Sequence, residues 1–107
     1  MLYELRVYDV LPGKMGVLLD RFHDTTTRLF ERHAIVLVGA WTVEIGESNT
    51  LIYLVAHEDW EQREQAWSAF RGDAEWHAAL EQSERDGPLL RRIHNRILRP
   101  TEFSPLQ

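Results

Sequence analysis

Two strand-like stretches of the sequence carry side chains suited to proton transfer on an anionic ligand. The first, LYELRVYDV, spans residues 2–10, and the second, LLRRIHNRILR, spans residues 89–99. Side chains two apart in a strand point to the same face of a sheet. Each stretch therefore gathers one polar set, namely Glu4, Arg6 and Tyr8 in the first and Arg92, His94 and Arg96 in the second.

These two polar sets share one surface if the stretches are neighbouring strands. His94 would then act as a catalytic base near neutral pH, and Tyr8 as a hydrogen-bond donor. Arg6 and Arg96 would hold an anionic ligand and stabilise developing negative charge. The competing interpretation is a structural salt-bridge ladder between the strands, in which Glu4 pairs with an arginine. Ion-pair networks of this kind are common outside active sites, so the ladder is the favoured interpretation.

An aromatic cluster between residues 67 and 77 is the second candidate site. It contains Trp67, Phe70, Trp76 and His77. A flat ligand could stack on these rings, with Trp67 and His77 as ligand-binding residues. The alternative is that the two tryptophans are large core fillers.

The order of secondary structure elements decides which of these residues meet. Alternation predicts a strand over 2–10, and an apolar stripe predicts a helix over 14–33. Two strands, 34–46 and 50–58, follow around the turn GESN, and a helical region covers 59–86 before the last strand. The order β-α-β-β-α-β predicts an α+β, ferredoxin-like fold with a four-stranded antiparallel sheet.

Several local signals support this order. Asp59 followed by Gln62 predicts a capping box, and Asp73 after Gly72 predicts a second helical segment. Gly39 inside a strand predicts a bulge or a close backbone approach. The predicted buried stripe of the first helix contains Met15, Leu19, Phe22, Thr26, Leu29 and Phe30, and Arg21 is placed on its outer face.

The faces of the outer strands can also be predicted. In the last strand, the set Ile93, Asn95 and Ile97 should face the helices. The polar set containing His94 should then lie on the opposite face. Glu4, Arg6 and Tyr8 are expected on that same face, away from the helices.

The strand TLIYLVA, residues 50–56, is apolar on both sides. A half-buried strand normally alternates between apolar and polar residues. Two helices cover only one face of a ferredoxin-like sheet, so a second copy of the chain is the expected cover for the other face. The tail 100–107 carries Phe103, which we expect to pack on the partner subunit.

The composition excludes several classes of function. The formal net charge is -5 at pH 7, which argues against nucleic-acid binding. There is no cysteine, which fits a reducing, cytoplasmic setting and rules out thiolate metal sites. No stretch is long and apolar enough for a membrane span. No metal-binding or phosphate-loop motif appears, so neither a metal site nor a cofactor is expected.

Three stretches resemble the NIPSNAP family of the dimeric α/β-barrel superfamily. They are GAWTVEIGESNTLIYLVAHEDWEQR, GDAEW and NRILRPTEFSP. The resemblance implies a single domain over residues 1–107, with 100–107 as a tail, that forms a homodimeric barrel.

The resemblance does not fix a reaction, because one fold hosts many functions. Its first implication is a homodimer of uncharacterised function that binds a small ligand. The alternative is a cofactor-independent monooxygenase or isomerase acting on a small aromatic or phenolic substrate. Heme-degrading relatives would use an asparagine in the first strand beside residues such as Trp67 and His77. The first strand here has no asparagine, so heme degradation is the less favoured reading.

Overall fold

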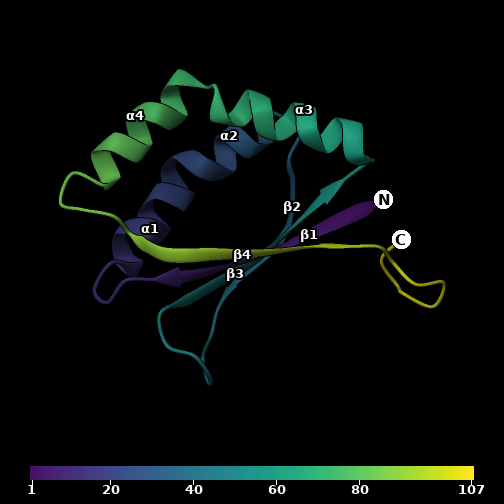
Figure 1. Cartoon of the computed structure of the whole chain (residues 1–107), viewed down its shortest axis with the longest axis horizontal. Helices are drawn as coiled ribbons and strands as arrows, with labels where there is room; N and C mark the ends of the chain where they lie inside the picture. Colours follow the sequence, from purple (N-terminus) through teal and green to yellow (C-terminus); the bar gives the residue numbers. More distant parts are fainter.

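A four-stranded antiparallel sheet carries all the helices on one face (Figure 1). The computed structural model describes all 107 residues. The elements are β1 (Leu2–Val10), α1 (Met15–Arg21), the π-helical turn η1 (Phe22–Thr26), α2 (Thr27–Arg32), β2 (Val36–Thr42), β3 (Thr50–His57), α3 (Trp60–Arg71), α4 (Ala74–Ser83) and β4 (Leu90–Leu98). The strand order is β2-β3-β1-β4, which confirms the predicted α+β, ferredoxin-like fold. No helix is long and apolar enough to cross a membrane.

The predicted helix signals are present in the structure. Asp59 accepts a hydrogen bond from the backbone N–H of Gln62 at 2.8 Å, and the Gln62 side chain accepts one from the N–H of Glu58 at 3.0 Å. Asp73 caps α4 by accepting from the N–H of Glu75 at 2.8 Å. These bonds satisfy amide donors that have no partner within a helix.

The first helical run differs from the predicted regular helix. A single π-helical turn, η1, separates α1 from α2. Leu18 is fully buried, whereas Leu19, which was predicted to be buried, is 39% exposed. Arg21, predicted on the outer face, is also buried because its side chain extends beneath α4 to Ser83.

Gly39 has both predicted properties. The register of β2 against β3 shifts between Leu37 and Gly39, which marks a bulge. A Cβ atom at Gly39 would lie 2.6 Å from Cη2 of Trp41, so any larger residue would collide with that ring. The glycine therefore lets Trp41 lie flat along its own strand.

The helix-covered face of β1 carries the polar set, contrary to the sequence prediction. Glu4 and Tyr8 are buried beneath the helices, and Arg6 lines a cavity on the same side. The prediction was wrong because a polar side chain of a strand can face the helices when the helices supply hydrogen-bond partners for it. Glu4 accepts hydrogen bonds from Arg63 and Trp67 of α3.

Strand β4 follows the predicted alternation. Tyr8 pairs with Ile93 and Arg6 with Asn95 in the antiparallel register, so Ile93 and Asn95 share the helix-covered face. His94, between them, points to the other face. Tyr8 and His94 therefore lie on opposite faces of the sheet, and a single small ligand cannot contact both.

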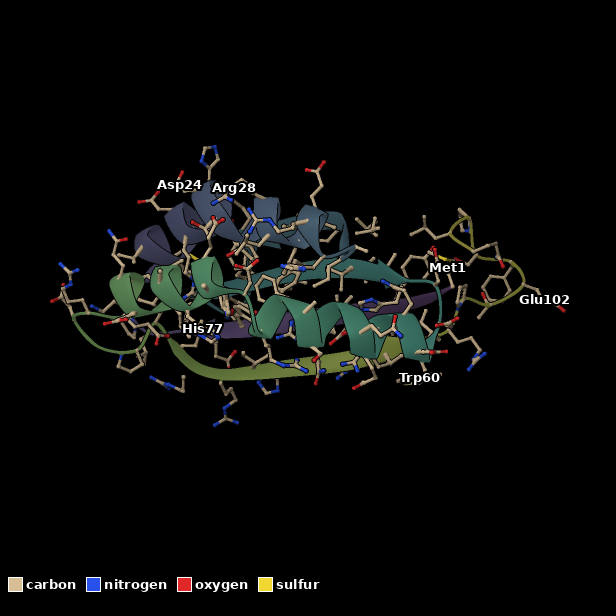
Figure 2. All side chains as sticks on the ribbon, turned by 90° about the horizontal axis from the view of Figure 1, so that it is seen from above. Met1, Asp24, Arg28, Trp60, His77 and Glu102 are labelled. Atoms are coloured by element: carbon tan, nitrogen blue, oxygen red, sulfur yellow. The ribbon has the colours of Figure 1, made fainter.

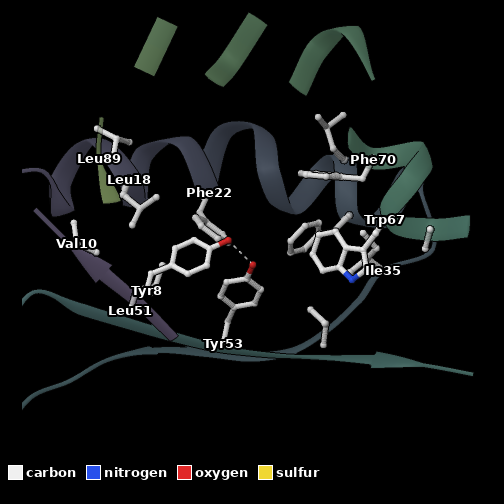
Figure 3. Close-up of a cluster of buried hydrophobic side chains, with 14 residues drawn as sticks. Tyr8, Val10, Leu18, Phe22, Ile35, Leu51, Tyr53, Trp67, Phe70 and Leu89 are labelled. Atoms are coloured by element: carbon white, nitrogen blue, oxygen red, sulfur yellow. Dashed lines mark hydrogen bonds between the residues drawn. The ribbon is translucent and has the colours of Figure 1, made fainter. Parts of the chain in front are cut away.

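Two rows of helices lie side by side above the sheet (Figure 2). Three ion pairs and one histidine–carboxylate hydrogen bond join α2 and the residue after it to the start of α4, and they involve Arg28, Arg32, His33, Asp73 and Glu75. Between the helices and the sheet lies a core of 14 buried residues that includes Tyr8, Phe22, Tyr53 and Trp67 (Figure 3).

No helix covers the other face of the sheet (Figure 1), and apolar side chains lie at its centre. Leu5 pairs with Leu54 and Val7 with Ile52 across the two central strands. Trp41, opposite Ile52 on the neighbouring strand, is 55% exposed. We call the side chains of Leu5, Val7, Trp41, Ile52 and Leu54 the open face.

The C-terminal tail turns back toward the edge of the open face. Its residues Pro100 and Leu106 line a shallow surface pocket together with Tyr3 and Leu54. Phe103 projects from the tail and is 87% exposed. Its predicted packing on a partner subunit stays a prediction.

Candidate functional site

A mostly apolar hollow lies between the sheet and the helices. It is a cavity of about 280 Å³ lined by 15 residues, 10 of them hydrophobic. Its wall includes aromatic rings from β1, η1, α3 and α4, namely Tyr8, Phe22, Trp67, Phe70 and Trp76. Ligand sites have this composition, with a mostly apolar lining and a few convergent polar groups.

A pair of tyrosines supplies hydroxyl groups to this cavity. The hydroxyl oxygens of Tyr8 and Tyr53 lie 2.7 Å apart and share a hydrogen bond (Figure 3). Arg6 donates from Nε to the Tyr53 hydroxyl at 2.6 Å. Burial raises the pKa of Tyr53 well above its usual value, and the neighbouring Tyr8 adds to the effect while Arg6 opposes it. The Tyr53 hydroxyl therefore stays protonated at neutral pH.

Arg6 is held in place by a buried carboxylate. Its Nη1 donates to Glu4 Oε2 at 3.1 Å, and its guanidinium lies 4.7 Å from the centre of the Trp67 ring. Glu4 is fully buried. Its remaining hydrogen bonds come from the side chains of His57, Arg63, Trp67 and Asn95.

This network keeps Glu4 ionised. Burial by itself would raise the pKa of the Glu4 carboxyl, because a charge is poorly solvated inside a protein. The hydrogen bonds from His57, Arg63, Asn95 and Trp67 reverse that effect and hold the pKa well below its usual range. Glu4 thus acts as the anchor that positions Arg6, rather than as a group facing the cavity.

Arg21 is a second arginine of the cavity wall that the sequence prediction missed. Its Nη1 donates to the Ser83 hydroxyl at 3.0 Å, and its guanidinium lies 5.0 Å from the centre of the Trp76 ring. Its Nε is buried and has no hydrogen-bond partner in the protein. Burial lowers the pKa of Arg21, and the nearby Glu84 opposes that shift.

The structure separates the predicted site residues into two groups. Arg6, Tyr8 and Trp67 line the cavity. His94 lies on the other face of the sheet, where its Nε2 is 3.1 Å from Asp9 Oδ2. Arg96 shares that face, since it is paired with Leu5.

His77 is also outside the cavity. It is exposed on α4 and bonds the backbone carbonyl of Arg71. The structure therefore does not bring His77 together with Trp67 in the cavity wall, because the imidazole is exposed on the surface of α4. No group of three or more histidine, aspartate or glutamate side chains is arranged to hold a metal ion.

The sequence prediction missed two site residues, and only one of them had a signal in the sequence. Tyr53 belongs to an apolar strand, and its alternation with Leu51 and Val55 on the helix side could have placed its ring in the core. Arg21 had no signal, because its burial depends on α4, which is 50 or more residues further along the chain.

Comparison with known proteins gives a consistent family. A model of the NIPSNAP family matches residues 3–105. Protein NipSnap homolog 1 of Danio rerio is 29% identical over 110 residues, which cover 99% of this chain and 36% of the relative. Protein NipSnap homolog 3A of Homo sapiens is 33% identical over 75 residues, which cover 69% of this chain and 30% of the relative. The chain spans about a third of the length of these curated relatives.

Solved structures of similar proteins point to the same family. A NIPSNAP family protein of unknown function from Agrobacterium tumefaciens is 28% identical, covers 100% of this chain and 94% of its own, and superposes with a TM-score of 0.88. An uncharacterised NIPSNAP-like domain protein from Burkholderia xenovorans is 28% identical, covers 97% and 88%, and has a TM-score of 0.86.

A Nitrosomonas europaea protein, which has been proposed to be an antibiotic biosynthesis monooxygenase, has a TM-score of 0.66 over 94% of this chain and 98% of its own. Its identity is 8%, so this likeness extends to the fold alone. The match over residues 3–105 and the two closely superposing structures lead to one conclusion: the chain belongs to the NIPSNAP family.

Proposed function

We propose that this NIPSNAP family protein binds a small ring-containing ligand in the cavity between its sheet and helices. The observation that carries the proposal is the cavity itself, about 280 Å³ in volume, with an aromatic wall and a hydroxyl pair. Pockets for small molecules are usually roughly 300–1,000 Å³ in volume, so this one suits a ligand at the small end.

The tyrosine pair supports a ligand that carries an oxygen acceptor. Two hydroxyls hold two protons, and the hydrogen bond between Tyr8 and Tyr53 uses one of them. Arg6 donates to the pair and takes no proton from it. One hydroxyl proton is therefore left to donate to a carbonyl, phenol or similar oxygen of the ligand.

Blocking the cavity tests this proposal. Ile93 lines the cavity and is 46% exposed at its rim, so Ile93→Trp should close it. The matched control is Leu19→Trp, on an α1 side chain that is 39% exposed and outside the cavity. We expect small aromatic compounds that raise the melting temperature of the wild type to do so for Leu19→Trp but not for Ile93→Trp. Equal responses in both variants would place the ligand elsewhere and refute the proposal.

We also propose that residues 1–107 act as one cytoplasmic domain that forms a homodimer through the open face, with residues 100–107 as a tail. The support is the row of apolar side chains from β1 and β3, where Leu5 faces Leu54 and Val7 faces Ile52. Exposed apolar patches of this kind mark association surfaces. A second copy of the same face buries them without a further partner.

The alternative is a cofactor-independent monooxygenase or isomerase acting on a small aromatic or phenolic substrate. The observation that favours it is the convergence of Tyr8, Tyr53 and Arg6, whose donors could stabilise an oxyanion that develops on the substrate. Oxygen uptake with a bound phenol would indicate a monooxygenase. Deuterium incorporation from heavy water without oxygen uptake would indicate an isomerase. Binding with neither signal would leave the protein a ligand binder.

A further inference from the structure

The cavity has an arginine at each end of an aromatic wall. Trp67, Phe70 and Trp76 follow one another along that wall, with successive ring centres 5.7 and 4.7 Å apart. Arg6 lies 4.7 Å from the Trp67 ring centre and Arg21 lies 5.0 Å from the Trp76 ring centre. All five side chains line the same cavity. A ring stacked along the wall would thus have a cation at either end.

The charges of the two arginines differ in how far nearby groups of the protein compensate them. Arg6 donates to the buried carboxylate of Glu4 at 3.1 Å and to the hydroxyl of Tyr53 at 2.6 Å. The carboxylate closest to Arg21 belongs to Glu84, whose Oε1 is 3.9 Å from Nη1. That carboxylate is 35% exposed, while the Arg21 side chain is only 5% exposed. The charge at the Arg21 end is therefore the less compensated one.

The hydrogen bonds of Arg21 leave one edge of its guanidinium free. The contacts with Ser83 and Glu84 both use Nη1. Nε is buried without a partner, and it shares with Nη2 the edge that forms paired hydrogen bonds to a carboxylate. A buried donor of this kind is costly unless an acceptor meets it. The free edge therefore fits a planar oxyanion.

The surroundings of Arg21 indicate from which side such an anion comes. On the outer surface, Arg21 and Ser83 border a shallow pocket that also contains Asp20 and Asp24, whose carboxylates repel anions. On the inner side lies the aromatic cavity, where Trp76 offers its ring beside the guanidinium and the one lining carboxylate, Glu84, lies near Nη1 of Arg21. Only on the inner side can an anion attached to an aromatic ring pair with the Arg21 guanidinium while its ring stacks on Trp76.

We propose that the ligand is an aromatic carboxylate, with its carboxylate on the Nε–Nη2 edge of Arg21 and its ring on Trp76 and Phe70. An oxygen at the far end of the ring accepts from the Tyr8–Tyr53 pair. This inference rests on the proposed ligand-binding function and deepens it, because it assigns the charge of the ligand and its orientation in the cavity.

Calorimetric titration at neutral pH tests the assignment with two probes of the same shape. Para-hydroxybenzoate carries the anion, and para-hydroxybenzamide replaces it with a neutral amide. The key variant is Arg21→Met, which keeps much of the side-chain volume and removes the charge. We expect it to weaken binding of the acid roughly 10- to 100-fold and to leave the amide within about threefold of the wild type.

Further variants separate the free edge from its surroundings. Ser83→Ala removes the bond to Nη1 but keeps the free edge, so binding of the acid should change less than about threefold. Glu84→Gln removes the competing carboxylate and should strengthen binding of the acid several-fold. If Arg21→Met fails to fold, Arg21→Lys retains the charge without the paired donors and should weaken the acid but not the amide.

Two of the possible outcomes overturn the anion site alone, and a third overturns the proposed function as well. Equal losses for acid and amide in the Arg21 variants would overturn the anion site while leaving the cavity as a binding site. Binding of the amide alone to the wild type would do the same. Failure of the acid, the amide and every neutral aromatic compound to bind would overturn both the anion site and the proposed function.

Discussion

A buried carboxylate organises the polar side chains of the cavity. Glu4 is fully enclosed and touches groups from β3, α3 and β4, among them His57, Arg63 and Asn95. Such a charge is tolerated only when its acceptor sites are filled. Glu4 accepts a hydrogen bond from Arg6, and Arg6 donates one to Tyr53. A substitution at Glu4 should therefore also displace the Tyr8–Tyr53 hydroxyl pair.

The pH dependence of stability should identify Glu4. Its folded-state pKa is held below the ordinary value of 4.5, so its stabilising contribution is complete above that pH and decreases as the pH falls further. The free energy of unfolding should lose up to about 1.4 kcal/mol per pH unit from this one group. Urea titrations of the wild type and Glu4→Gln between about pH 5 and pH 3 measure the difference.

In the Glu4→Gln variant, the part of the pH dependence of the unfolding free energy that comes from Glu4 should vanish. The variant should also be about 3 kcal/mol less stable at neutral pH, because Arg6 and Arg63 lose their shared partner. An unchanged slope would mean that Glu4 is already protonated in the folded protein.

The two faces of the sheet can be distinguished by a pair of variants. Replacing both Tyr8 and Tyr53 by phenylalanine removes the free hydroxyl proton, so a phenolic or carbonyl ligand should bind about fivefold to tenfold more weakly. His94→Gln is the control, since His94 bonds Asp9 on the opposite face and should leave binding unchanged. Titration calorimetry on both proteins would contradict the site if the histidine variant lost affinity and the tyrosine variant did not.

At the scale of elements, α4 is the least anchored part of the cavity wall. It has no buried residue, yet it contributes Trp76 and Leu80 to the cavity. Its first turn is held by Asp73, which caps the helix and accepts hydrogen bonds from Arg32 at 3.1 Å and His33 at 2.6 Å. The position of this wall thus depends on a few polar contacts at one end.

Asp73→Ala should loosen α4. The hydrogen bond from His33, followed by the bond from the Glu75 N–H, lowers the pKa of Asp73 to about 2 from an ordinary 3.8. Its contribution to stability is therefore present above about pH 4 and lost as the pH falls toward 2. Amide hydrogen exchange in α4 should accelerate in the variant at neutral pH, while α3, which has its own cap at Asp59, serves as the internal control.

The same Asp73 variant and the wild type should converge in thermal midpoint as the pH approaches 2. A difference in midpoint that stayed constant across this range would show that the helix cap, rather than the ionised carboxylate, supplies the whole effect.

The sequence predicted the elements better than it predicted their faces. Caps at Asp59 and Asp73 and the bulge at Gly39 act locally, so their signals lie within a few residues. The face of β1 could not be predicted, because the polar side chain of Glu4 is buried only through partners that are distant in sequence. The cavity residues Arg6, Tyr8 and Trp67 were identified individually, but the alternation rule grouped two of them with His94.

At the scale of the whole molecule, the open face accounts for the apolar strand TLIYLVA. Leu51, Tyr53 and Val55 turn toward the helices and are buried, while Ile52 and Leu54 turn outward. A single copy of the chain leaves this outward set without a cover. Two copies, face to face, would enclose it and would bring His94 and its pair Asp9 close to the interface.

Sedimentation equilibrium tests this assembly. The chain mass is 12.6 kDa, and the wild type at micromolar concentration should sediment at about twice that value. Ile52→Arg places a charge in the centre of the open face and should give a folded monomer or abolish folding. Val17→Arg, on an α1 side chain that is 41% exposed, is the control and should remain dimeric. A wild type that sediments as a monomer would contradict the proposed dimer.

The four tryptophans report directly on whether an aromatic ligand occupies the cavity. Trp67 and Trp76 line the cavity, whereas Trp41 and Trp60 lie outside it and are 55% and 51% exposed. The measurement is the set of indole N–H signals in a nitrogen-15 NMR spectrum during titration with para-hydroxybenzoate. Saturable shifts are expected for Trp67 and Trp76 and none for the other two. Shifts confined to Trp41 and Trp60, or no shift in any indole, would contradict the proposed binding in the cavity.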